Sequence, residues 1–316
     1  MYTRYGPPEV VRLEDVARPE PGPADLLIRV RATTVNRTDC GVRGADPFIV
    51  RLFTGLTRPR HTILGSEFAG EVEAVGHEVT SFAVGDAVFG MARDDSGAHA
   101  EYIRLPESAS VAKQPAGVSH QQAAPTCDGA ALALTALRLA GVEPGQRILV
   151  NGATGAIGSA AVQLAKHFGA EVTAVCGTEN LELVSSLGAD RVIDFKREDF
   201  TKGGGAYDVV FDAVGQSSFR RCRRLVKPGG VFLFTDLGFL WHVPVLALLT
   251  RFVGNKRVRI PVTRHDQRDI RFLRDLVEQA AFAPVIDRSY PLEEIVDAYR
   301  YVETGEKVGN VVINVG

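Results

Sequence analysis

The chain has 316 residues, 45% hydrophobic and 23% charged, with a formal net charge of −2, which is typical of a globular protein with room for two domains. This balance gives no electrostatic reason to expect nucleic acid or an anionic membrane as a partner. The four cysteines are widely spaced without a Cys-x-x-Cys pair, which argues against a structural zinc lobe or a disulfide framework and favours a reducing, cytoplasmic location.

The first third of the chain is predicted to be mostly β-structure. Residues 26–35 alternate in polarity and are rich in β-branched side chains, which is typical of a strand. Residues 68–76 and 86–90 show the same pattern, with glycines marking turns. The following segment, 121–141, is rich in alanine and leucine and predicts a helix.

Strands and helices then alternate along the chain. An apolar run at 147–151 predicts a strand, and residues 156–169 predict a helix that ends at Gly169. The order continues with a strand at 171–176, a helix at 181–188, strands at 191–195 and 208–212, a turn at 227–230 and a strand at 231–235. This βαβα order predicts a parallel sheet with helices on both faces.

An apolar segment at 238–253 looks like a membrane helix in composition. It is shorter than a bilayer requires, and Asp236, Pro244 and Arg251 lie in or beside it, so we expect no membrane span. A pocket wall, a lid or a subunit interface is the expected role. Two amphipathic helices and a closing strand are predicted beyond it, at 269–280, 292–303 and 309–315.

A glycine-rich turn joins the first strand of this alternating region to its helix. The pattern is Ala153-x-Gly155-x-x-Gly158, with alanine at the first position of the dinucleotide-binding fingerprint. In that context the backbone amides can approach a pyrophosphate at the helix N-terminus, whose dipole favours an anion. The alternative is a tight turn with a structural role only.

The sequence leaves the choice between NADPH and NADH open. The tip of the second strand, at Cys176, is not acidic, which favours NADPH. Glu179 lies about twenty residues beyond the glycines, where an acidic partner of the NADH ribose is usual. Lys196 and Arg197 follow the third strand and can serve a phosphate, or they belong to a solvated loop.

Several motifs, in order and spacing, resemble the medium-chain dehydrogenase/reductase superfamily, nearest to its zinc-free quinone oxidoreductase branch related to zeta-crystallin. They are YGPPEVVRLEDV, VNRTDC, LGSEFAGEVEAVG, NGATGAIGSAAVQLAK, LGADRVIDF and DVVFDAVG. The resemblance implies an α/β fold with a GroES-like β-rich catalytic domain at 1–122 and 258–316. It also implies a Rossmann domain, a doubly wound parallel sheet, at 123–257, and a homodimer formed through the strand at 231–235.

The same resemblance implies that the metal is lost. Zinc members carry Cys-x-Ser/Thr-Asp where this chain has Asn36-Arg37-Thr38-Asp39, and a histidine where it has Ser66. The third ligand position falls on Cys127. One soft ligand without its partners cannot form a tetrahedral zinc site, so we expect no metal.

Loss of zinc limits the chemistry. Zinc stabilises developing charge on a carbonyl oxygen, whereas a quinone or an α,β-unsaturated carbonyl spreads that charge by conjugation. We therefore expect a zinc-independent oxidoreductase that transfers hydride from NADPH, with NADH as the alternative, to a quinone or enone. An alcohol dehydrogenase and a non-catalytic NADPH-binding protein are the rival hypotheses.

Five residues are candidates for catalysis. Asn36 donates a hydrogen bond to substrate or nicotinamide, or it is a polar strand-end residue that bonds backbone. Thr38 matches a proton-relaying hydroxyl of zinc members, and Ser66 either acts on substrate or fills the space of the lost histidine. Cys127 is a reactive thiol or a buried inert one, and Asp128 is an acid or a helix cap.

The resemblance also implies cofactor and substrate contacts. The expected cofactor contacts are Arg37, Thr154, Gly155, Ala156, Ile157, Gly158, Cys176, Thr178, Glu179, Val214, Leu237 and Gly238. By chain position, an apolar substrate pocket is expected from Phe48, Leu52, Phe53 and Trp241. The alternative for the pocket residues is plain core packing.

Overall fold

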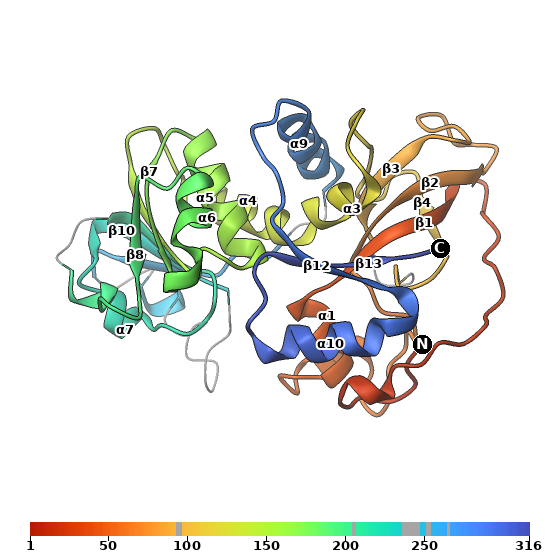
Figure 1. Ribbon diagram of the computed structural model, residues 1–316, viewed down its shortest axis with the longest axis horizontal. Coiled ribbons are helices and arrows are strands. Elements are labelled where there is room, and N and C mark those ends of the chain that lie inside the picture. The colour runs from red at the N-terminus through yellow and green to blue at the C-terminus, as the bar shows by residue number, and fades with distance from the viewer. Residues whose placement is uncertain (93–96, 204–206, 236–246, 251–253, 264–265) are drawn as a thin grey trace. The chain divides into compact units, whose positions relative to one another are not determined.

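The chain forms two compact units in a computed structural model that describes residues 1–92, 97–203, 207–235, 247–250, 254–263 and 266–316. Unit 1 comprises Met1–Asp128 together with His265–Gly316, and unit 2 comprises Gly129–Arg264 (Figure 1). The sequence predicts boundaries after residues 122 and 257, which lie a few residues before the observed boundaries after Asp128 and Arg264.

Unit 1 is built on a seven-stranded sheet with the order β12-β13-β1-β2-β3-β5, and β4 also pairs with β1. The pairs are antiparallel except β12 with β13, which is parallel. Alternating apolar residues of β1, such as Leu26, Ile28 and Val30, are buried, as their pattern predicts. The strands are β1 (Asp25–Val35), β2 (Glu67–Val75), β3 (Ala87–Met91), β4 (Tyr102–Pro106), β5 (Val111–Lys113), β12 (Ile286–Pro291) and β13 (Asn310–Asn314).

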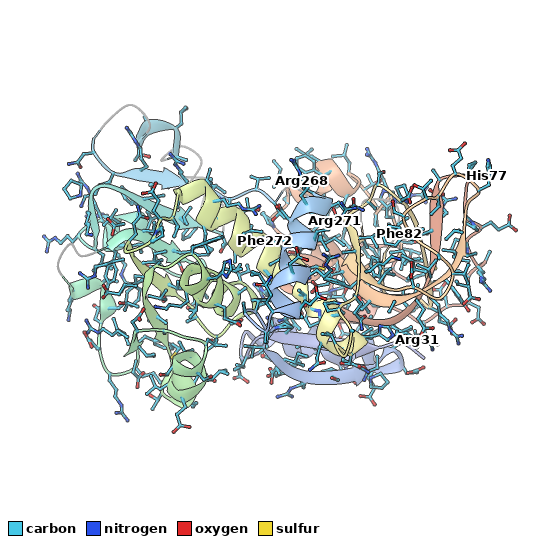
Figure 2. The ribbon with its side chains drawn as sticks, turned by 90° about the horizontal axis from the view of Figure 1, so that it is seen from above. Arg31, His77, Phe82, Arg268, Arg271 and Phe272 are labelled. Carbon is cyan, nitrogen blue, oxygen red and sulfur yellow. The ribbon has the colours of Figure 1, made fainter. Side chains whose placement is uncertain are left out.

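The helices of unit 1 are short apart from two near the C-terminus. Helix α9 (Gln267–Glu278) buries Ile270, Leu273 and Leu276, while Arg268 and Arg271 stay exposed (Figure 2). The other helices are α1 (Arg37–Gly44), α2 (Val50–Thr54), α3 (His120–Ala123) and α10 (Ile295–Thr304), with 3₁₀ turns at Pro8–Val10, Ala124–Thr126 and Leu292–Glu294. The sequence did not predict α1.

The prediction of a single helix at 121–141 is wrong in one respect. The segment divides into α3, a 3₁₀ turn and α4 (Asp128–Ala140). Pro125 stands in the turn, where it cannot donate to a helical hydrogen bond and its ring restricts the preceding residue. Asp128 therefore begins a new helix and is also the last residue of unit 1.

Unit 2 has a six-stranded sheet with the order β11-β10-β9-β6-β7-β8, and every pair is parallel. This confirms the parallel sheet predicted from the alternating pattern. The elements are β6 (Arg147–Asn151), α5 (Ala156–His167), β7 (Glu171–Cys176), α6 (Leu181–Ser186), β8 (Arg191–Asp194), β9 (Tyr207–Asp212), α7 (Phe219–Cys222), β10 (Val226–Phe234) and β11 (Arg257–Arg259), with 3₁₀ turns at Thr178–Asn180 and Phe200–Lys202.

Two details of β10 differ from the sequence-based expectation. The predicted turn at 227–230 is an irregularity inside the strand, with Gly229 at a φ of 83°, because the register with β9 shifts between Val226 and Val231. The strand at 231–235 is also not the edge of the described sheet, since β11 pairs with its outer side. Residues 231–233 of β10 are therefore paired on both sides, with β9 and β11.

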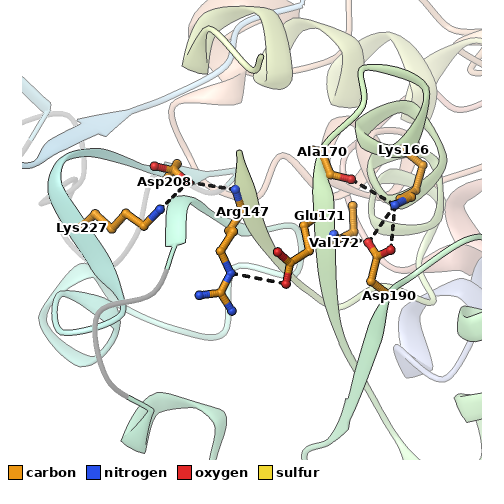
Figure 3. A network of polar contacts seen from close by, with 8 residues as sticks. All are labelled: Arg147, Lys166, Ala170, Glu171, Val172, Asp190, Asp208 and Lys227. Carbon is orange, nitrogen blue, oxygen red and sulfur yellow. Dashed lines mark hydrogen bonds and ion pairs between the residues drawn. The ribbon is translucent and has the colours of Figure 1, made fainter. Parts of the chain in front are cut away.

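Charged residues tie together the beginnings of the parallel strands. The Arg147 amide donates to Asp208 at 2.8 Å, Asp208 also pairs with Lys227, and the Arg147 guanidinium lies 3.4 Å from Glu171 (Figure 3). Lys166 pairs with Asp190 at 2.8 Å. These contacts lie at the N-terminal ends of the strands. Ligands of an open parallel sheet bind at the opposite, C-terminal ends.

The apolar segment at 238–253 lies outside the described residues except for 247–250. Among the helices that the structure does describe, none has the length and apolar character needed to cross a bilayer.

Candidate functional site

Asn36 and Ser66 contact each other directly in unit 1. Asn36 caps α1: its Oδ1 accepts from the Asp39 amide at 2.9 Å, and the Asp39 carboxylate accepts from the Asn36 amide at 3.1 Å. Because the cap occupies Oδ1, the Asn36 Nδ2 faces Ser66 and donates to its Oγ at 2.6 Å. Asn36 thus forms a hydrogen bond with the backbone, which is one of the two roles considered for it, and it also orients Ser66.

Glu67, next to Ser66, is a fully buried carboxylate with three hydrogen-bond donors around it. Thr34 Oγ1 donates to its Oε1 at 2.6 Å, and the amides of Cys127 and Asp128 donate to its Oε2 at 3.2 Å and 2.6 Å. Burial and the nearby Asp128 charge raise the pKa of Glu67, while the bonds from Asp128 and Thr34 oppose the rise. Glu67 therefore joins β1, β2 and the start of α4.

Two further acids, Asp39 and Asp128, and the thiol of Cys127 lie near Glu67. Burial raises the pKa of Asp39 to about 8, and the Asp128 charge adds to the rise. Burial also raises the pKa of Asp128, opposed by Lys307. Cys127 is fully buried, and burial together with the charges of Glu67 and Asp128 raises the pKa of its thiol well above the ordinary value. A neutral, buried thiol fits the inert alternative for Cys127 better than the reactive one.

The remaining candidates of unit 1 lie on its surface. Arg37 and Thr38 occupy the first turn of α1 and are both exposed. Phe48, Leu52 and Phe53 are 69%, 56% and 77% exposed, so the core-packing alternative is wrong for them. They form an apolar surface at α2 and the residues just before it.

The three positions that bind zinc in other members hold Asn36, Ser66 and Cys127 here. Asn36 and Ser66 are hydrogen-bonded to each other, and Cys127 is a buried thiol with a raised pKa. Across the described ranges, no group of three or more histidine, cysteine, aspartate or glutamate side chains is arranged to hold a metal ion.

The glycine turn of unit 2 has the geometry that a dinucleotide requires. Gly152 has a φ of 80°, and a Cβ on Gly158 would lie 2.0 Å from the Gly152 carbonyl oxygen, so both positions demand glycine. Gly155 caps α5 without a side-chain hydrogen bond, which leaves the amides of the first turn available. Thr154 lies in the turn, whereas Ala156 and Ile157 are the first two residues of α5, and all three stay predicted contacts of the NAD(P)H pyrophosphate.

Two buried aspartates that the sequence reasoning missed shape the neighbouring loops. Asp212, at the end of β9, accepts from the Asn151 amide group at 3.0 Å and from the backbone amides of Val214, Gly215 and Ser217. Val214 then lies against the glycine turn, since a Cβ on Gly152 would meet its Cγ2 at 1.7 Å. An aspartate as the last residue of an apolar strand is the signal that points to such positions.

Asp194, at the end of β8, is the second of these aspartates. Its carboxylate accepts from Thr178 Oγ1 at 2.6 Å and lies 3.3 Å from the Arg197 guanidinium. Glu179 and Lys196 form an ion pair beside it, and Cys176 is buried at the end of β7. The expected contacts Leu237, Gly238 and Trp241 lie outside the described residues.

Comparison with known proteins agrees with this architecture. Residues 22–116 match the alcohol dehydrogenase GroES-like domain, and residues 187–313 match a family described as zinc-binding dehydrogenase. The chain is 34% identical to the 2-methylene-furan-3-one reductase of Solanum lycopersicum, covering 99% of this chain and 78% of the relative. It is 31% identical to the NADPH-dependent alkenal/one oxidoreductase of Arabidopsis thaliana, with the same coverage.

A solved structure of a quinone oxidoreductase from Coxiella burnetii superposes with a TM-score of 0.88 at 28% identity, covering 100% of this chain and 98% of the other. The chain belongs to the medium-chain dehydrogenase/reductase superfamily, in its quinone oxidoreductase branch. The description of one matching family as zinc-binding contrasts with the Asn36 and Ser66 pair found at two ligand positions.

Proposed function

We propose that this protein reduces quinones or α,β-unsaturated carbonyls with NADPH and without a catalytic metal. The observation that carries the proposal is the 2.6 Å hydrogen bond between Asn36 and Ser66, which joins two positions that bind zinc in other members. The names of the relatives, an enone reductase, an alkenal/one oxidoreductase and a quinone oxidoreductase, support the same substrate class.

Ser66 is the residue that we propose to meet the substrate oxygen. NADPH, when bound, supplies the hydride. Since Ser66 Oγ accepts from Asn36, the Ser66 hydroxyl proton points away from Asn36 and is available for donation. One such donor suffices for a conjugated acceptor, because the developing charge is already delocalised. Asn36 acts as the positioning residue, held in turn by the Asp39 cap.

Product formation also needs a proton, and we propose Asp128 and Thr38 for this role. The raised pKa of Asp128 keeps part of its carboxyl protonated closer to neutrality than an ordinary aspartate. The exposed Thr38 hydroxyl, on the first turn of α1, is placed to exchange protons with water. Phe48, Leu52 and Phe53 offer an apolar surface suited to a ring or alkyl substituent of the substrate.

The test is oxidation of NADPH and NADH with a polycyclic ortho-quinone and a short enone, each with and without chelator. We expect chelator-independent turnover, and a loss in kcat of about tenfold or more in Ser66→Ala, since removing a donor to a developing oxyanion typically costs more than that. Ser186→Ala, whose hydroxyl donates to the Leu183 carbonyl on α6, is the matched control.

The rival hypotheses correspond to other outcomes. Alcohol oxidation that requires zinc would identify an alcohol dehydrogenase and overturn the metal-free proposal. Tight NADPH binding without turnover of any acceptor would favour a binding protein. The homodimer and the cytoplasmic location stay predictions, and light scattering after gel filtration tests the first of them.

A further inference from the structure

A charged cluster lies where the adenosine ribose of a dinucleotide is expected. We define the Asp194 cluster as Thr178, Glu179, Asp194, Lys196 and Arg197. It follows the ends of β7 and β8, the strand ends at which ligands bind in an open parallel sheet. A role for this cluster in cofactor choice rests on the proposed function, because it requires that the protein uses NADPH.

Asp194 organises this cluster. The carboxylate is only 9% exposed; its Oδ2 accepts from Thr178 Oγ1 at 2.6 Å, and its Oδ1 accepts from the Lys196 amide at 2.9 Å. Arg197 Nε lies 3.3 Å from Oδ2. The two backbones also meet, because the Phe195 amide donates to the Cys176 carbonyl at 3.1 Å. The loop that carries both cations is thus anchored beside the tip of β7.

The Glu179–Lys196 ion pair covers that tip directly. A Cβ built on Gly177, the residue after β7, would lie 2.9 Å from Glu179 Oε2 and 3.5 Å from Lys196 Cε. Both side chains are largely in solvent, with exposures of 65% and 48%. A solvent-exposed ion pair contributes little to stability, so either partner can exchange for a bound ligand at low cost.

The Glu179–Lys196 pair combines an acid, which favours NADH at this position, with a cation, which favours NADPH. An acid near the second strand accepts from the ribose hydroxyl of NADH and repels the additional phosphate of NADPH, whereas a cation favours that phosphate. Here the acid is neutralised by Lys196, and a second cation, Arg197, stands next in sequence. Because Lys196 neutralises the charge of Glu179, this acid does not prevent NADPH from binding.

We propose that Lys196 is the residue that discriminates between the cofactors, by exchanging partners. When the ligand carries a 2′-phosphate, Lys196 leaves Glu179 and binds the phosphate, with Arg197 as the second cation. When the ligand carries a 2′-hydroxyl, Lys196 stays with Glu179, whose carboxylate accepts from the hydroxyl. NADPH is favoured because a phosphate near −2 charge attracts Lys196 more strongly than the single carboxylate of Glu179 does.

The test uses the adenosine halves of the two cofactors, so it does not depend on turnover. Binding of 2′,5′-ADP and of 5′-AMP is measured by calorimetry on the full chain, for wild type, Lys196→Met, Glu179→Gln and Lys202→Met. Lys202 lies in the next turn, Phe200–Lys202, and its variant removes the same charge outside the cluster. Circular dichroism checks that each variant is folded.

We expect Lys196→Met to weaken 2′,5′-ADP binding about tenfold or more while 5′-AMP binding changes less than about twofold. Glu179→Gln is expected to tighten 2′,5′-ADP binding and weaken 5′-AMP binding, and Lys202→Met to change neither. Equal effects of Lys196→Met on both ligands, or none on either, would overturn the exchange. Wild type that binds neither ligand would overturn the proposed function as well, so the two failures are distinguishable.

Discussion

Glu67 offers a sharp test of how unit 1 is held together. Two substitutions separate its hydrogen bonds from its charge. Glu67→Gln keeps the shape and the acceptor but removes the charge, whereas Glu67→Leu removes both. Glutamine can turn its oxygen to the amides of Cys127 and Asp128 and its nitrogen to Thr34, whose hydroxyl accepts as readily as it donates.

The magnitudes follow from the three bonds. In Glu67→Leu the two amides and the Thr34 hydroxyl lose their acceptor in a buried place, at about 1–3 kcal/mol each. Part of that loss is offset because no carboxylate remains to be desolvated. We expect Glu67→Leu to lose about 3 kcal/mol or more of unfolding free energy, and Glu67→Gln to stay within about 1 kcal/mol of wild type at pH 7.

The charge adds a pH dependence of predictable sign. The pKa of Glu67 is raised in the folded state from its ordinary value of 4.5, so the folded chain holds the proton more tightly than the unfolded chain. Its contribution is therefore fully present below pH 4.5 and is lost as the pH rises through the raised pKa. Glu67→Gln removes this slope, so its stability relative to wild type increases with pH.

Urea unfolding from pH 4.5 to 8 measures the free energies, and hydrogen exchange in a peptide spanning residues 120–134 reports on the two amides directly. Faster exchange in Glu67→Leu than in Glu67→Gln is the expected result. If the leucine variant were as stable and as protected as the glutamine variant, the three hydrogen bonds would not hold the start of α4.

Four further predictions concern other parts of the chain. Gly158→Ala places a Cβ 2.0 Å from the Gly152 oxygen, so we expect it to lose about 1–3 kcal/mol of stability. Gly155→Ala meets that oxygen only at 3.7 Å, so it should fold normally but bind NADPH more weakly, as nucleotide fluorescence would show. Burial lowers the pKa of His99 to about 4 from 6.5, so wild type should lose stability as the pH falls from 6.5 toward 4, and His99→Gln should flatten that part of a melting-temperature profile. Asp212→Ala deprives three backbone amides of their acceptor and should speed exchange over residues 213–217, whereas Asp212→Asn should do so less.

The elements of unit 2 were predictable because their signals are local. The strand at 147–151 is a bounded apolar run, and the helix at 156–167 stops where Gly169 adopts a φ of 78°. Helix α1 was missed for the opposite reason. Its sequence, RTDCGVRG, has two glycines and little apolar periodicity, and its ends are set by the Asn36 cap and by Ala45, which adopts a left-handed φ of 52°.

The candidate site was only half visible in the sequence. The resemblance placed Asn36 and Ser66 at ligand positions, but their bond joins residues 30 positions apart and depends on the Asp39 cap. The contact from Cys127 to Glu67 spans 60 positions. No local pattern records such pairings, since they arise only when β1, β2 and the start of α4 are packed together.

The sheet of unit 1 has a consequence for synthesis on the ribosome. Strand β1 lies between β2 and β13, and the Arg31 guanidinium donates to the Gly316 carbonyl, 285 positions further along the chain. At about 5–20 residues per second, β1 waits roughly 15 to 60 s for that partner, long enough for all of unit 2 to emerge and fold. During this interval β4 already pairs with Asp25–Arg29 of β1, but the Ala32–Val35 part, which pairs with β13, is an unpaired edge, open to pairing with another nascent chain. We therefore expect demand for a chaperone to fall on the first-made strands of this protein rather than on its later parallel sheet.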